Sequence, residues 1–531
     1  MNLYQQVIFK SRYARFLPEL NRREEWKETV LRYMTFLIKQ VNKYGSKFTK
    51  EEELEIAIAI CDLEVMPSMR LLMTAGEAVE RDNICAYNCA YLAINNKRAF
   101  SEALYILMNG TGVGFSCEKQ EISRLPTIPN ELREVDDTII VGDSKLGWAK
   151  AYRKLLSSLW DGDIPKIDYS RIRAAGERLR TFGGRASGPE PLHRLFNYIT
   201  QTFQQAKGRK LTSIEVHDIL CMTGEVVVVG GVRRSALISL SDLTDRGMRE
   251  AKVGAWWEHN PQRALANNSV VYTEKPDVET FMEEWLSLIK SKSGERGIFN
   301  RLAAGNQAAK FGRRDKDRNY GCNPCSEIIL RDKQFCNLTE VVVRSKDGFE
   351  QLKSKVRIAS ILGTIQSTLT EFNFLSEDWK KNCEEERLLG VSLTGIMDHP
   401  ILSQCGDTVI DWLGKLRDEA RKTNKEWANR LGISKSAAIT CIKPSGTVSE
   451  LVGSSSGIHP RYSEFYIRAI RQDNKDPLTD FLKDNGIRSE SCFGKEEHNT
   501  VFFFPIHSPV ESRRRDRITA IEQLEHWLIY Q

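Results

Sequence analysis

The segment NCAYLAINNKRAFSEALYILMNGTGVGFS (residues 88–116) opens with a short β-rich run and continues as a helical stretch. NCAYLAI (88–94) predicts a strand and RAFSEALYILMN (98–109) predicts a helix. The glycines of NGTGVGFS (109–116) indicate a tight turn from that helix into a strand, or else a close approach of the backbone to a ligand. Strands that alternate with helices of ten or more residues are typical of α/β proteins with a largely parallel sheet.

The same alternation continues along the chain. Further β-rich runs predict strands at GEVVVV (224–229), SALISL (235–240), NSVVY (268–272), LTEVVV (338–343) and TVFFFPI (500–506). Further helices are predicted at GWAKAYRKLLSSLW (147–160) and PDVETFMEEWLSLIKSK (276–292). Because no Ser/Gly-rich or Pro-rich linker divides these elements, we expect one continuous domain over residues 67–531.

The N-terminal residues have a different, purely helical pattern. One amphipathic helix stops at Gly45, and a second begins at Thr49, where Glu52 completes a capping box. We therefore expect a small helical region over residues 1–66.

Composition excludes several classes of protein. The 531 residues are 41% hydrophobic and 28% charged, and the net charge of +6 is too small for this length to argue for nucleic acid. No run approaches the roughly 18 apolar residues of a membrane helix, and the N-terminus lacks the apolar core of a secretory signal. We expect a cytoplasmic protein without a membrane partner. Its twelve cysteines are then reduced, and clustered ones are metal-binding or catalytic rather than structural.

The cysteines cluster in GCNPCSEIILRDKQFCNL (residues 321–338) and near residue 87. Cys322 and Cys325 form C-x-x-C, while Cys85 and Cys89 form C-x-x-x-C, so four thiolates could make a structural zinc site. Glu327 fits zinc poorly, because it lies on the same face as Cys325 if the segment is extended. Zinc, a redox or radical thiol site, and unrelated buried cysteines remain as about equal alternatives. The eight histidines show no paired-ligand spacing such as H-E-x-x-H.

A second candidate site is IKPSGTVSELVGSSSGIHP (residues 442–460). Small hydroxyl residues and backbone N–H groups at the start of a helix are typical of a phosphate site. The P-loop order is absent, and a plain Ser/Thr-capped turn explains the spacing as well.

Together these segments resemble the large catalytic chain of ribonucleotide reductases, specifically the adenosylcobalamin-dependent class II type of the ribonucleoside-triphosphate reductase branch. About a dozen motifs occur in family order over residues 10–475. They include NCAYLAI, GTGVGFS, GDSKLGW, RTFGGRASGPEPL, GGVRRSALISL, RALANNSVVY, GERGIFNR, NPCSEI with FCNL, ERLLGVSLTGI and KPSGTVSELVGSSSGIHPRY.

The resemblance implies a ten-stranded α/β barrel of two parallel five-stranded halves with a central finger loop. It also implies an enzyme that reduces ribonucleotides, as triphosphates, to 2′-deoxyribonucleotides for DNA synthesis. Adenosylcobalamin would generate a thiyl radical, and a cysteine pair would supply two electrons. A class I-type catalytic subunit and an inactive nucleotide-binding fragment of a split reductase are the alternatives.

The resemblance also assigns roles to five residues. Cys325 is the thiyl-radical cysteine at the tip of the finger loop. Asn323 holds the ribose hydroxyls, and Glu327 is the general base for the 3′-hydroxyl. Cys89 protonates the leaving 2′-hydroxyl and ends as a disulfide with Cys336. This reading excludes a metal at these cysteines.

Further implied sites concern nucleotide binding. The substrate phosphates would lie on the loop formed by Ser445, Gly446, Thr447 and Ser449. Asp143 and Ser144 of GDSKLGW would contact a deoxynucleotide effector, and a thioredoxin-type protein would re-reduce the cysteine pair. Family chains continue beyond the position of Gln531, so we expect the last part of the barrel to be missing or supplied by a separate C-terminal polypeptide.

Overall fold

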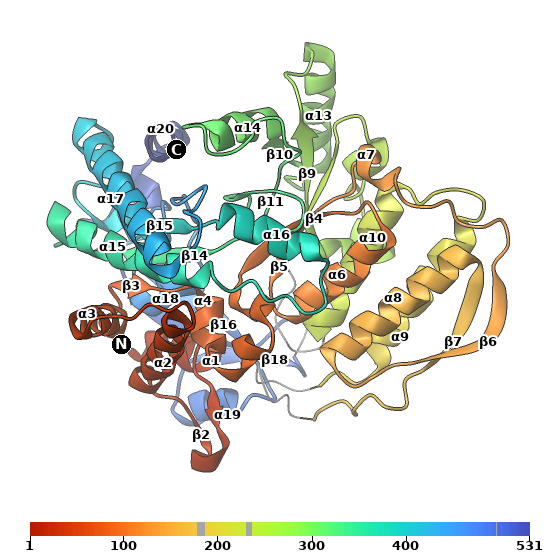
Figure 1. Ribbon diagram of the computed structural model, residues 1–531, viewed down its shortest axis with the longest axis horizontal. Coiled ribbons are helices and arrows are strands. Elements are labelled where there is room, and N and C mark those ends of the chain that lie inside the picture. Colours follow the sequence, from red (N-terminus) through yellow and green to blue (C-terminus); the bar gives the residue numbers. More distant parts are fainter. Residues whose placement is uncertain (178–185, 230–235, 495) are drawn as a thin grey trace. The chain divides into compact units, whose positions relative to one another are not determined.

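The structure is a computed structural model that describes residues 1–177, 186–229, 236–494 and 496–531 (Figure 1). Contacts divide the chain into two compact units, which are described separately. Unit 1 comprises residues 1–76, 338–366 and 389–531, and unit 2 comprises residues 77–337 and 367–388. Each unit combines helices with strands, which confirms the α/β class. The motifs RTFGGRASGPEPL and GGVRRSALISL lie partly outside the described residues.

The main sheet of unit 2 has six strands in the order β10-β9-β8-β5-β4-β13. The first five are mutually parallel, and β13 is antiparallel to β4. Their bounds are β4 Cys89–Ala93, β5 Gly112–Ser116, β8 Leu237–Asp242, β9 Ala266–Tyr272, β10 Gly297–Asn300 and β13 Gln334–Phe335. A parallel sheet of this kind is buried on both faces, which explains the continuously buried β4 and β5.

The opening segment of the sequence folds as predicted, as strand, helix and strand. The helix α6 (Lys97–Met108) connects β4 to the parallel strand β5. Asn96 caps α6, because its side chain accepts hydrogen bonds from the backbone N–H groups of Arg98 and Ala99. Gly110 adopts a left-handed conformation (φ 79°) at the turn, which glycine tolerates without strain.

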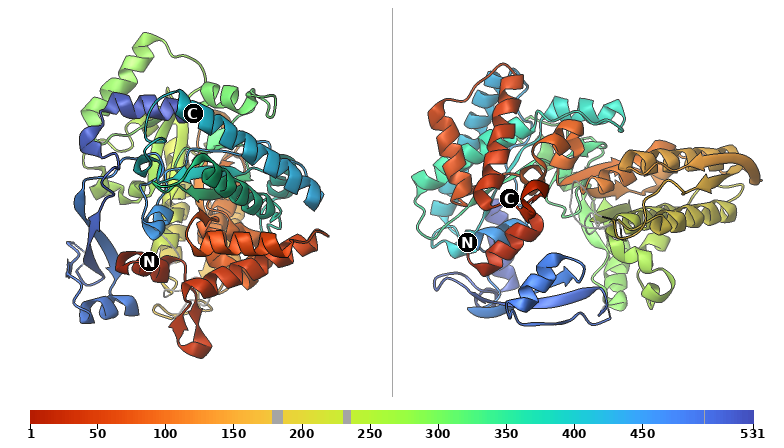
Figure 2. Two further views of the ribbon diagram at one scale, coloured as in Figure 1. Left: turned by 90° about the vertical axis from the view of Figure 1, so that its left-hand side faces the viewer. Right: turned by 90° about the horizontal axis from the view of Figure 1, so that it is seen from below.

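The remaining elements of unit 2 extend this core. Its other principal helices are α8 Lys145–Asp161, α9 Glu190–Gln205, α10 Ser213–Val229, α13 Val278–Ser291, α14 Arg301–Ala309 and α16 Glu377–Glu386. Shorter helices are α5 Glu77–Arg81, α7 Lys119–Ile122, α11 Arg246–Arg249 and α12 Trp256–His259. Two parallel strands, β6 (Arg133–Ile140) and β7 (Asp163–Asp168), form a ribbon beside α8 and α9 (Figures 1 and 2).

The prediction of a strand at GEVVVV was wrong, because residues 224–229 form the last turns of α10. β-branched residues disfavour a helix by only about 0.5 kcal/mol each. Extending an existing helix avoids the unfavourable nucleation step. In addition, the side chains of Val226 and Val227 are buried in the helical conformation. Cooperativity and burial therefore outweigh local preference.

Unit 1 contains the N-terminal helices, an antiparallel pair of short strands (β1 and β2) and two three-stranded sheets. One sheet has the order β15-β14-β3, with β14 and β15 parallel, and the other has the order β16-β18-β17. The strands are β1 Phe16–Leu17, β2 Arg22–Arg23, β3 Val65–Met66, β14 Leu338–Val342, β15 Gly390–Thr394, β16 Phe465–Asp473, β17 Ser489–Ser491 and β18 Asn499–His507. The helices are α1 Leu3–Arg12, α2 Trp26–Lys43, α3 Lys50–Cys61, α4 Met69–Thr74, α15 Phe349–Gln366, α17 Asp407–Leu431, α18 Thr447–Val452, α19 Pro477–Asp484 and α20 Ala520–Tyr530.

Two predictions about the N-terminal helices are confirmed. α2 covers the first predicted helix, and α3 has Thr49 as its N-cap with the reciprocal hydrogen bonds of a capping box to Glu52. The predicted boundary between residues 66 and 67 stays a prediction. Within the described ranges, no helix is long and apolar enough to cross a bilayer.

Candidate active site

A short hairpin in unit 2 carries the first three candidate residues. Strands β11 (Gly321–Cys322) and β12 (Ile329–Leu330) pair antiparallel, and residues 323–328 form the turn between them. Cys325 is exposed at the tip, whereas Asn323 is fully buried at its base. The hairpin therefore presents one thiol outward from a buried support.

Asn323 organises the turn and holds the carboxylate of Glu327. The Asn323 side-chain amide donates to Glu327 Oε2 at 2.6 Å, and its Oδ1 accepts from the backbone N–H of Ile328 at 3.0 Å. Glu327 Oε1 is buried and accepts no hydrogen bond from any described residue. A buried carboxylate oxygen without a partner is costly, and such exceptions indicate a strain or a catalytic role.

The glycines of NGTGVGFS allow this hairpin to lie directly on β5. A Cβ at Gly114 would come within 1.9 Å of the Cys322 carbonyl oxygen, and one at Gly112 would meet Pro324 Cγ at 3.1 Å. Real Cβ atoms do not approach backbone at 1.9 Å, so position 114 requires glycine. The sequence left a tight turn and a close approach to a ligand as alternatives, and the close approach observed at these glycines is to the chain's own hairpin.

Cys89 and Cys336 are cross-strand neighbours. The register of β13 on β4 pairs Phe335 with Ala90, and the Cys336 backbone N–H donates to the Cys89 carbonyl at 2.9 Å. Directly opposite residues have Cβ atoms roughly 4.5–5.5 Å apart, so little movement is needed to form a disulfide. The side chains are buried to different degrees, with relative exposures of 9% for Cys89 and 1% for Cys336.

The hairpin tip and the cysteine pair meet at Gly112. In the parallel register of β4 and β5, Cys89 pairs with Gly112, and Gly112 lies under Pro324 next to Cys325. The five candidates, which are scattered over residues 89–336 of the sequence, thus belong to one neighbourhood in unit 2.

An aromatic cluster fixes β13 and therefore Cys336. The centroid of the Phe335 ring lies 5.2 Å from the centroid of the Tyr87 ring, and 4.8 Å from the ring centroids of Phe372 and Trp379. Such ring pairs contribute about 0.5–1.5 kcal/mol each beyond their buried area. Cys336, the next residue along the chain, is consequently held beside a packed apolar cluster.

Two buried arginines, which sequence reasoning missed, hold the two ends of the hairpin. Arg301 makes a bidentate pair with Glu118, at 2.6 and 2.8 Å, and donates through Nε to the carbonyl of Tyr320, just before β11. Burial alone would lower the pKa of Arg301, but the hydrogen bonds and charge of Glu118 outweigh it and raise the pKa. Arg301 ends the motif GERGIFNR, but neither its spacing nor its residue type indicated this contact.

Arg314 holds the other end. It donates through Nη1 to the carbonyl of Ile329 in β12 at 2.9 Å and through Nη2 to Glu386 at 2.8 Å. Gln334 of β13 also donates to Glu386, at 2.7 Å. The β11–β12 hairpin, through Arg314, and strand β13, through Gln334, are therefore both linked to the Glu386 carboxylate on α16.

The other cysteines of the motifs have structural surroundings. Burial raises the pKa of Cys322 to about 12, and its thiol donates weakly to Ser326 Oγ at 3.7 Å. The Cys85 thiol donates to the carbonyl of Asp82 at 3.2 Å. Among the residues described, no group of three His, Cys, Asp or Glu side chains is arranged to hold a metal ion.

The phosphate-loop candidates lie in unit 1, at the start of α18. Ser445 Oγ donates to Glu340 at 2.5 Å and accepts from the Ser449 backbone N–H at 3.0 Å. Gly446 is exposed, and a Cβ there would meet nothing within 4 Å. The open side of the loop is therefore at Gly446 and Thr447, while Ser445 and Ser449 are buried supports.

The effector candidates lie in unit 2, at the start of α8. Ser144 is the N-cap of α8, with its hydroxyl accepting from the Gly147 backbone N–H at 2.9 Å. Asp143 pairs with Arg173 at 2.9 Å, and both side chains are about one-third exposed.

Solved structures identify the fold. The B12-dependent class II ribonucleotide reductase aligns with 99% of this chain and 85% of its own, with a TM-score of 0.84 and 24% identity. The class Id ribonucleotide reductase α subunit of Actinobacillus ureae aligns with 91% of this chain and 79% of its own, at a TM-score of 0.51 and 13% identity. The chain therefore has the fold of a class II ribonucleotide reductase.

Sequence relatives narrow the identification. The adenosylcobalamin-dependent ribonucleoside-triphosphate reductase of Lactobacillus gasseri is 28% identical over 94% of this chain and 79% of its own length. A probable enzyme of the same name from Dictyostelium discoideum is 29% identical over 98% of this chain and 72% of its own. No family model matches the chain. The chain is a relative of the adenosylcobalamin-dependent ribonucleoside-triphosphate reductases, which confirms the resemblance found in its motifs.

Proposed function

We propose that this chain catalyses the radical-based reduction of ribonucleotides to 2′-deoxyribonucleotides with adenosylcobalamin as cofactor. The observation that carries the proposal is the hairpin tip on β5, which brings an exposed thiol beside a cross-strand cysteine pair. Substrates are ribonucleoside triphosphates, by similarity to the names of the relatives.

Cys325 is the radical-carrying residue. Its thiol is exposed, which fits a cofactor that reaches the site from outside the polypeptide. Adenosylcobalamin, when bound, supplies the radical that removes the hydrogen atom from the Cys325 thiol. The resulting thiyl takes the 3′-hydrogen of the ribose, and the same hydrogen returns to C3′ at the end of the cycle.

Glu327 accepts the proton of the 3′-hydroxyl. Its Oε2 is already bound by Asn323, so the unpartnered Oε1 is the oxygen that takes the proton. The second amide N–H of Asn323 is left to orient the ribose hydroxyls.

The cysteine pair removes the 2′-hydroxyl and supplies two electrons. Cys89 is the more exposed of the two and donates the proton with which the 2′-hydroxyl leaves as water. Cys89 and Cys336 then lose their two electrons to the substrate and form a disulfide, and the second thiol proton goes to the nucleotide. A thioredoxin-type dithiol restores the pair.

Other features are assigned by the same resemblance. The five parallel strands of unit 2 are one half of a ten-stranded barrel, and the β11–β12 hairpin is its finger loop. The substrate phosphates bind at the open side of the loop containing Gly446 and Thr447. Asp143 and Ser144 contact a deoxynucleotide effector.

Replacement of the radical cysteine tests this function. Cys325→Ser should abolish deoxynucleotide formation, measured with adenosylcobalamin, a ribonucleoside triphosphate and a dithiol. The cobalt-coupled thiyl signal in electron paramagnetic resonance should disappear with it. Melting should change little, because the side chain is exposed.

Cys405→Ser is the matched control, since Cys405 is the other exposed cysteine among the described residues. It should keep both activity and signal. Turnover by Cys325→Ser would overturn the assignment, and a folded wild-type protein that gives neither product nor signal would overturn the function.

A further inference from the structure

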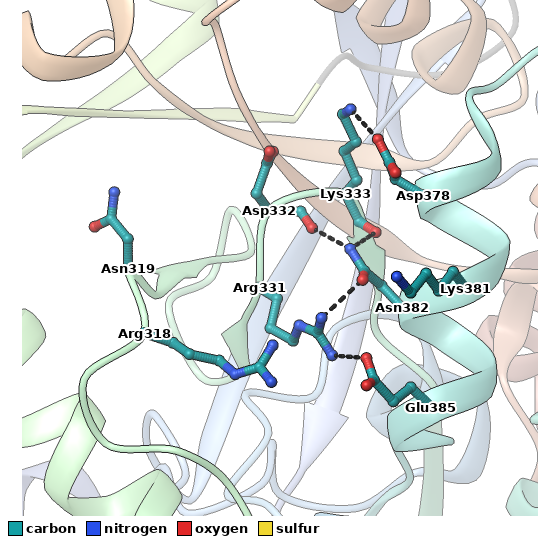
Figure 3. Close-up of a pocket in the computed structure, with 9 residues that line it drawn as sticks. All are labelled: Arg318, Asn319, Arg331, Asp332, Lys333, Asp378, Lys381, Asn382 and Glu385. Atoms are coloured by element: carbon teal, nitrogen blue, oxygen red, sulfur yellow. Dashed lines mark hydrogen bonds and ion pairs between the residues drawn. The ribbon is translucent and has the colours of Figure 1, made fainter.

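A charged cavity of about 510 Å³ lies in unit 2, at the base of the finger hairpin (Figure 3). Its walls are the loop before β11, residues 331–333 between β12 and β13, and one face of α16. None of the five proposed catalytic residues lines it, so it is distinct from the site described above.

The cavity contains more positive than negative side chains. Four cationic side chains (Arg318, Arg331, Lys333 and Lys381) face three carboxylates (Asp332, Asp378 and Glu385). Its lining has no aromatic or aliphatic residue. The cavity therefore offers a ligand charge and hydrogen bonding, but no aromatic or aliphatic side chain.

Two of the cations already have an exposed carboxylate partner, and Arg331 in addition lies 3.7 Å from the buried carboxylate of Glu386. Arg331 lies 2.6 Å from Glu385, and Lys333 lies 2.6 Å from Asp378. The two carboxylates are 50% and 60% exposed, whereas the two cations are only 13% and 15% exposed. Such half-exposed pairs contribute at most about 1 kcal/mol, so a multivalent anion can displace the carboxylates while the cations stay in place.

The other two cations have no carboxylate partner among the described residues. No ion pair of Arg318 or Lys381 occurs within 4.0 Å in this part of the chain. Both cations nevertheless interact electrostatically with the Glu385 carboxylate. The hydrogen bond and charge of Arg331 are the chief cause of its lowered pKa, and the charges of Arg318 and Lys381 lower it further. Figure 3 shows the side chains of Arg318 and Arg331, which come from different walls of the cavity.

We propose that this cavity binds the polyphosphate group of a small ligand, and that it does so without regard to any attached base. Two arginines and two lysines that line one cavity are suited to phosphate oxygens, which a guanidinium group binds bidentately. The volume suits a ligand of the size of a triphosphate.

The cavity is connected to the finger hairpin through hydrogen bonds. The Arg331 backbone N–H donates to Gln334 Oε1, and Gln334 donates to Glu386, which also binds Arg314. A ligand that draws Arg331 away from Glu385 therefore acts on the network that holds β12. Binding itself does not depend on the proposed function.

Calorimetric titration of the full chain with tripolyphosphate tests the proposal. Other anion sites in the protein can also bind this probe, so the measured quantity is the difference between wild type and a double variant, Arg318→Gln with Lys381→Gln. We expect the variant to lose one equivalent of binding, or to bind it about tenfold more weakly, because two charged hydrogen-bond donors are removed. ATP and CTP should show the same difference as tripolyphosphate, and adenosine should show none.

Lys380→Gln is the matched control, because Lys380 lies on the same helix but pairs with Glu371 outside the cavity. It should bind tripolyphosphate like the wild type. Equal binding by the double variant, or a difference that depends on the base, would overturn the proposal. If the double variant melts early, Lys381→Gln alone serves, since its side chain is exposed.

A second readout follows the connection to the hairpin. The rate at which Cys325 is alkylated should change at least twofold when tripolyphosphate is added to the wild type, and should not change in the double variant. An identical response of the two proteins would show that the anion acts elsewhere.

Discussion

At the scale of single residues, the two carboxylate oxygens of Glu327 differ in their hydrogen bonding. One accepts a hydrogen bond from Asn323 at 2.6 Å, and the other is buried and accepts none from the residues that the structure describes. This arrangement fixes the carboxylate while leaving one oxygen to accept a proton. This arrangement supports the base role that the resemblance implied and that we propose for Glu327.

Glu327→Gln should lower kcat by about 10²- to 10⁴-fold, since the amide cannot accept the 3′-hydroxyl proton. Radical formation at Cys325 should persist, because that step does not use the carboxylate. Steady-state product formation and electron paramagnetic resonance separate the two effects. Glu258→Gln, at an exposed position of α12, should leave both unchanged. Loss of the thiyl signal in Glu327→Gln would contradict this division of roles.

At the scale of elements, the contact between the hairpin and β5 depends on the absence of a side chain at Gly114. Gly114→Ala places a methyl group against the Cys322 carbonyl oxygen, so the hairpin must move. We expect a loss of about 1–3 kcal/mol or more in the free energy of unfolding and a strong loss of activity. Denaturant titration and product formation measure the two.

Gly414→Ala provides the opposite case. Gly414 lies inside α17, and a Cβ there would meet nothing within 4 Å. The substitution should stabilise the protein by about 0.5–1 kcal/mol and leave activity unchanged. If both alanine variants behaved alike, the close approach at Gly114 would not be the cause.

The Arg301–Glu118 pair is an element-level support of the hairpin. Arg301→Lys keeps the charge but loses the bidentate geometry and the bond to the Tyr320 carbonyl. Because Glu118 would remain buried and poorly paired, unfolding should become easier by roughly 3 kcal/mol. Alkylation of Cys325 should also become faster as the hairpin loosens.

The matched substitution is Arg246→Lys on the surface of α11. Arg246 pairs with Glu250, but its side chain is 84% exposed. Its replacement should change the unfolding free energy by less than about 0.5 kcal/mol. Equal effects of the two lysine variants would argue against a special role for Arg301.

At the scale of the whole molecule, buried thiols make stability depend on alkaline pH. Burial raises the pKa values of Cys322 and Cys383 from 9.0 to about 12. Between pH 9 and pH 12 these thiols keep their protons in the folded protein but lose them in the unfolded chain. Their contribution to the free energy of unfolding is therefore fully present below pH 9 and falls as the pH rises towards 12. Each thiol contributes at most about 1.4 kcal/mol per pH unit.

Urea unfolding between pH 7.5 and pH 10.5 measures this dependence. Cys383→Ala should flatten the curve above pH 9, whereas Cys405→Ala, at an exposed thiol, should leave its slope unchanged. A slope that Cys383→Ala does not alter would show that this thiol titrates normally in the folded protein.

The sequence by itself determined the features that depend on neighbouring residues. The strand–helix–strand pattern of residues 88–116, the helices α8 and α13, and the capping box of Thr49 and Glu52 were all predicted. Each follows from local periodicity or from a hydrogen bond within one turn. Asn323, Cys325 and Glu327 likewise lie within five residues of sequence, which keeps them close together in any local structure.

Only the tertiary structure decided features that depend on long-range burial and pairing. The helical state of Val226 and Val227 follows from burial and helix cooperativity, which outweigh β preference. The resemblance implied that Cys89 pairs with Cys336, but the register of β13 on β4 is what makes them neighbours. Arg301 and Arg314 had no signal in the sequence, because a buried ion pair is specified by its remote partner.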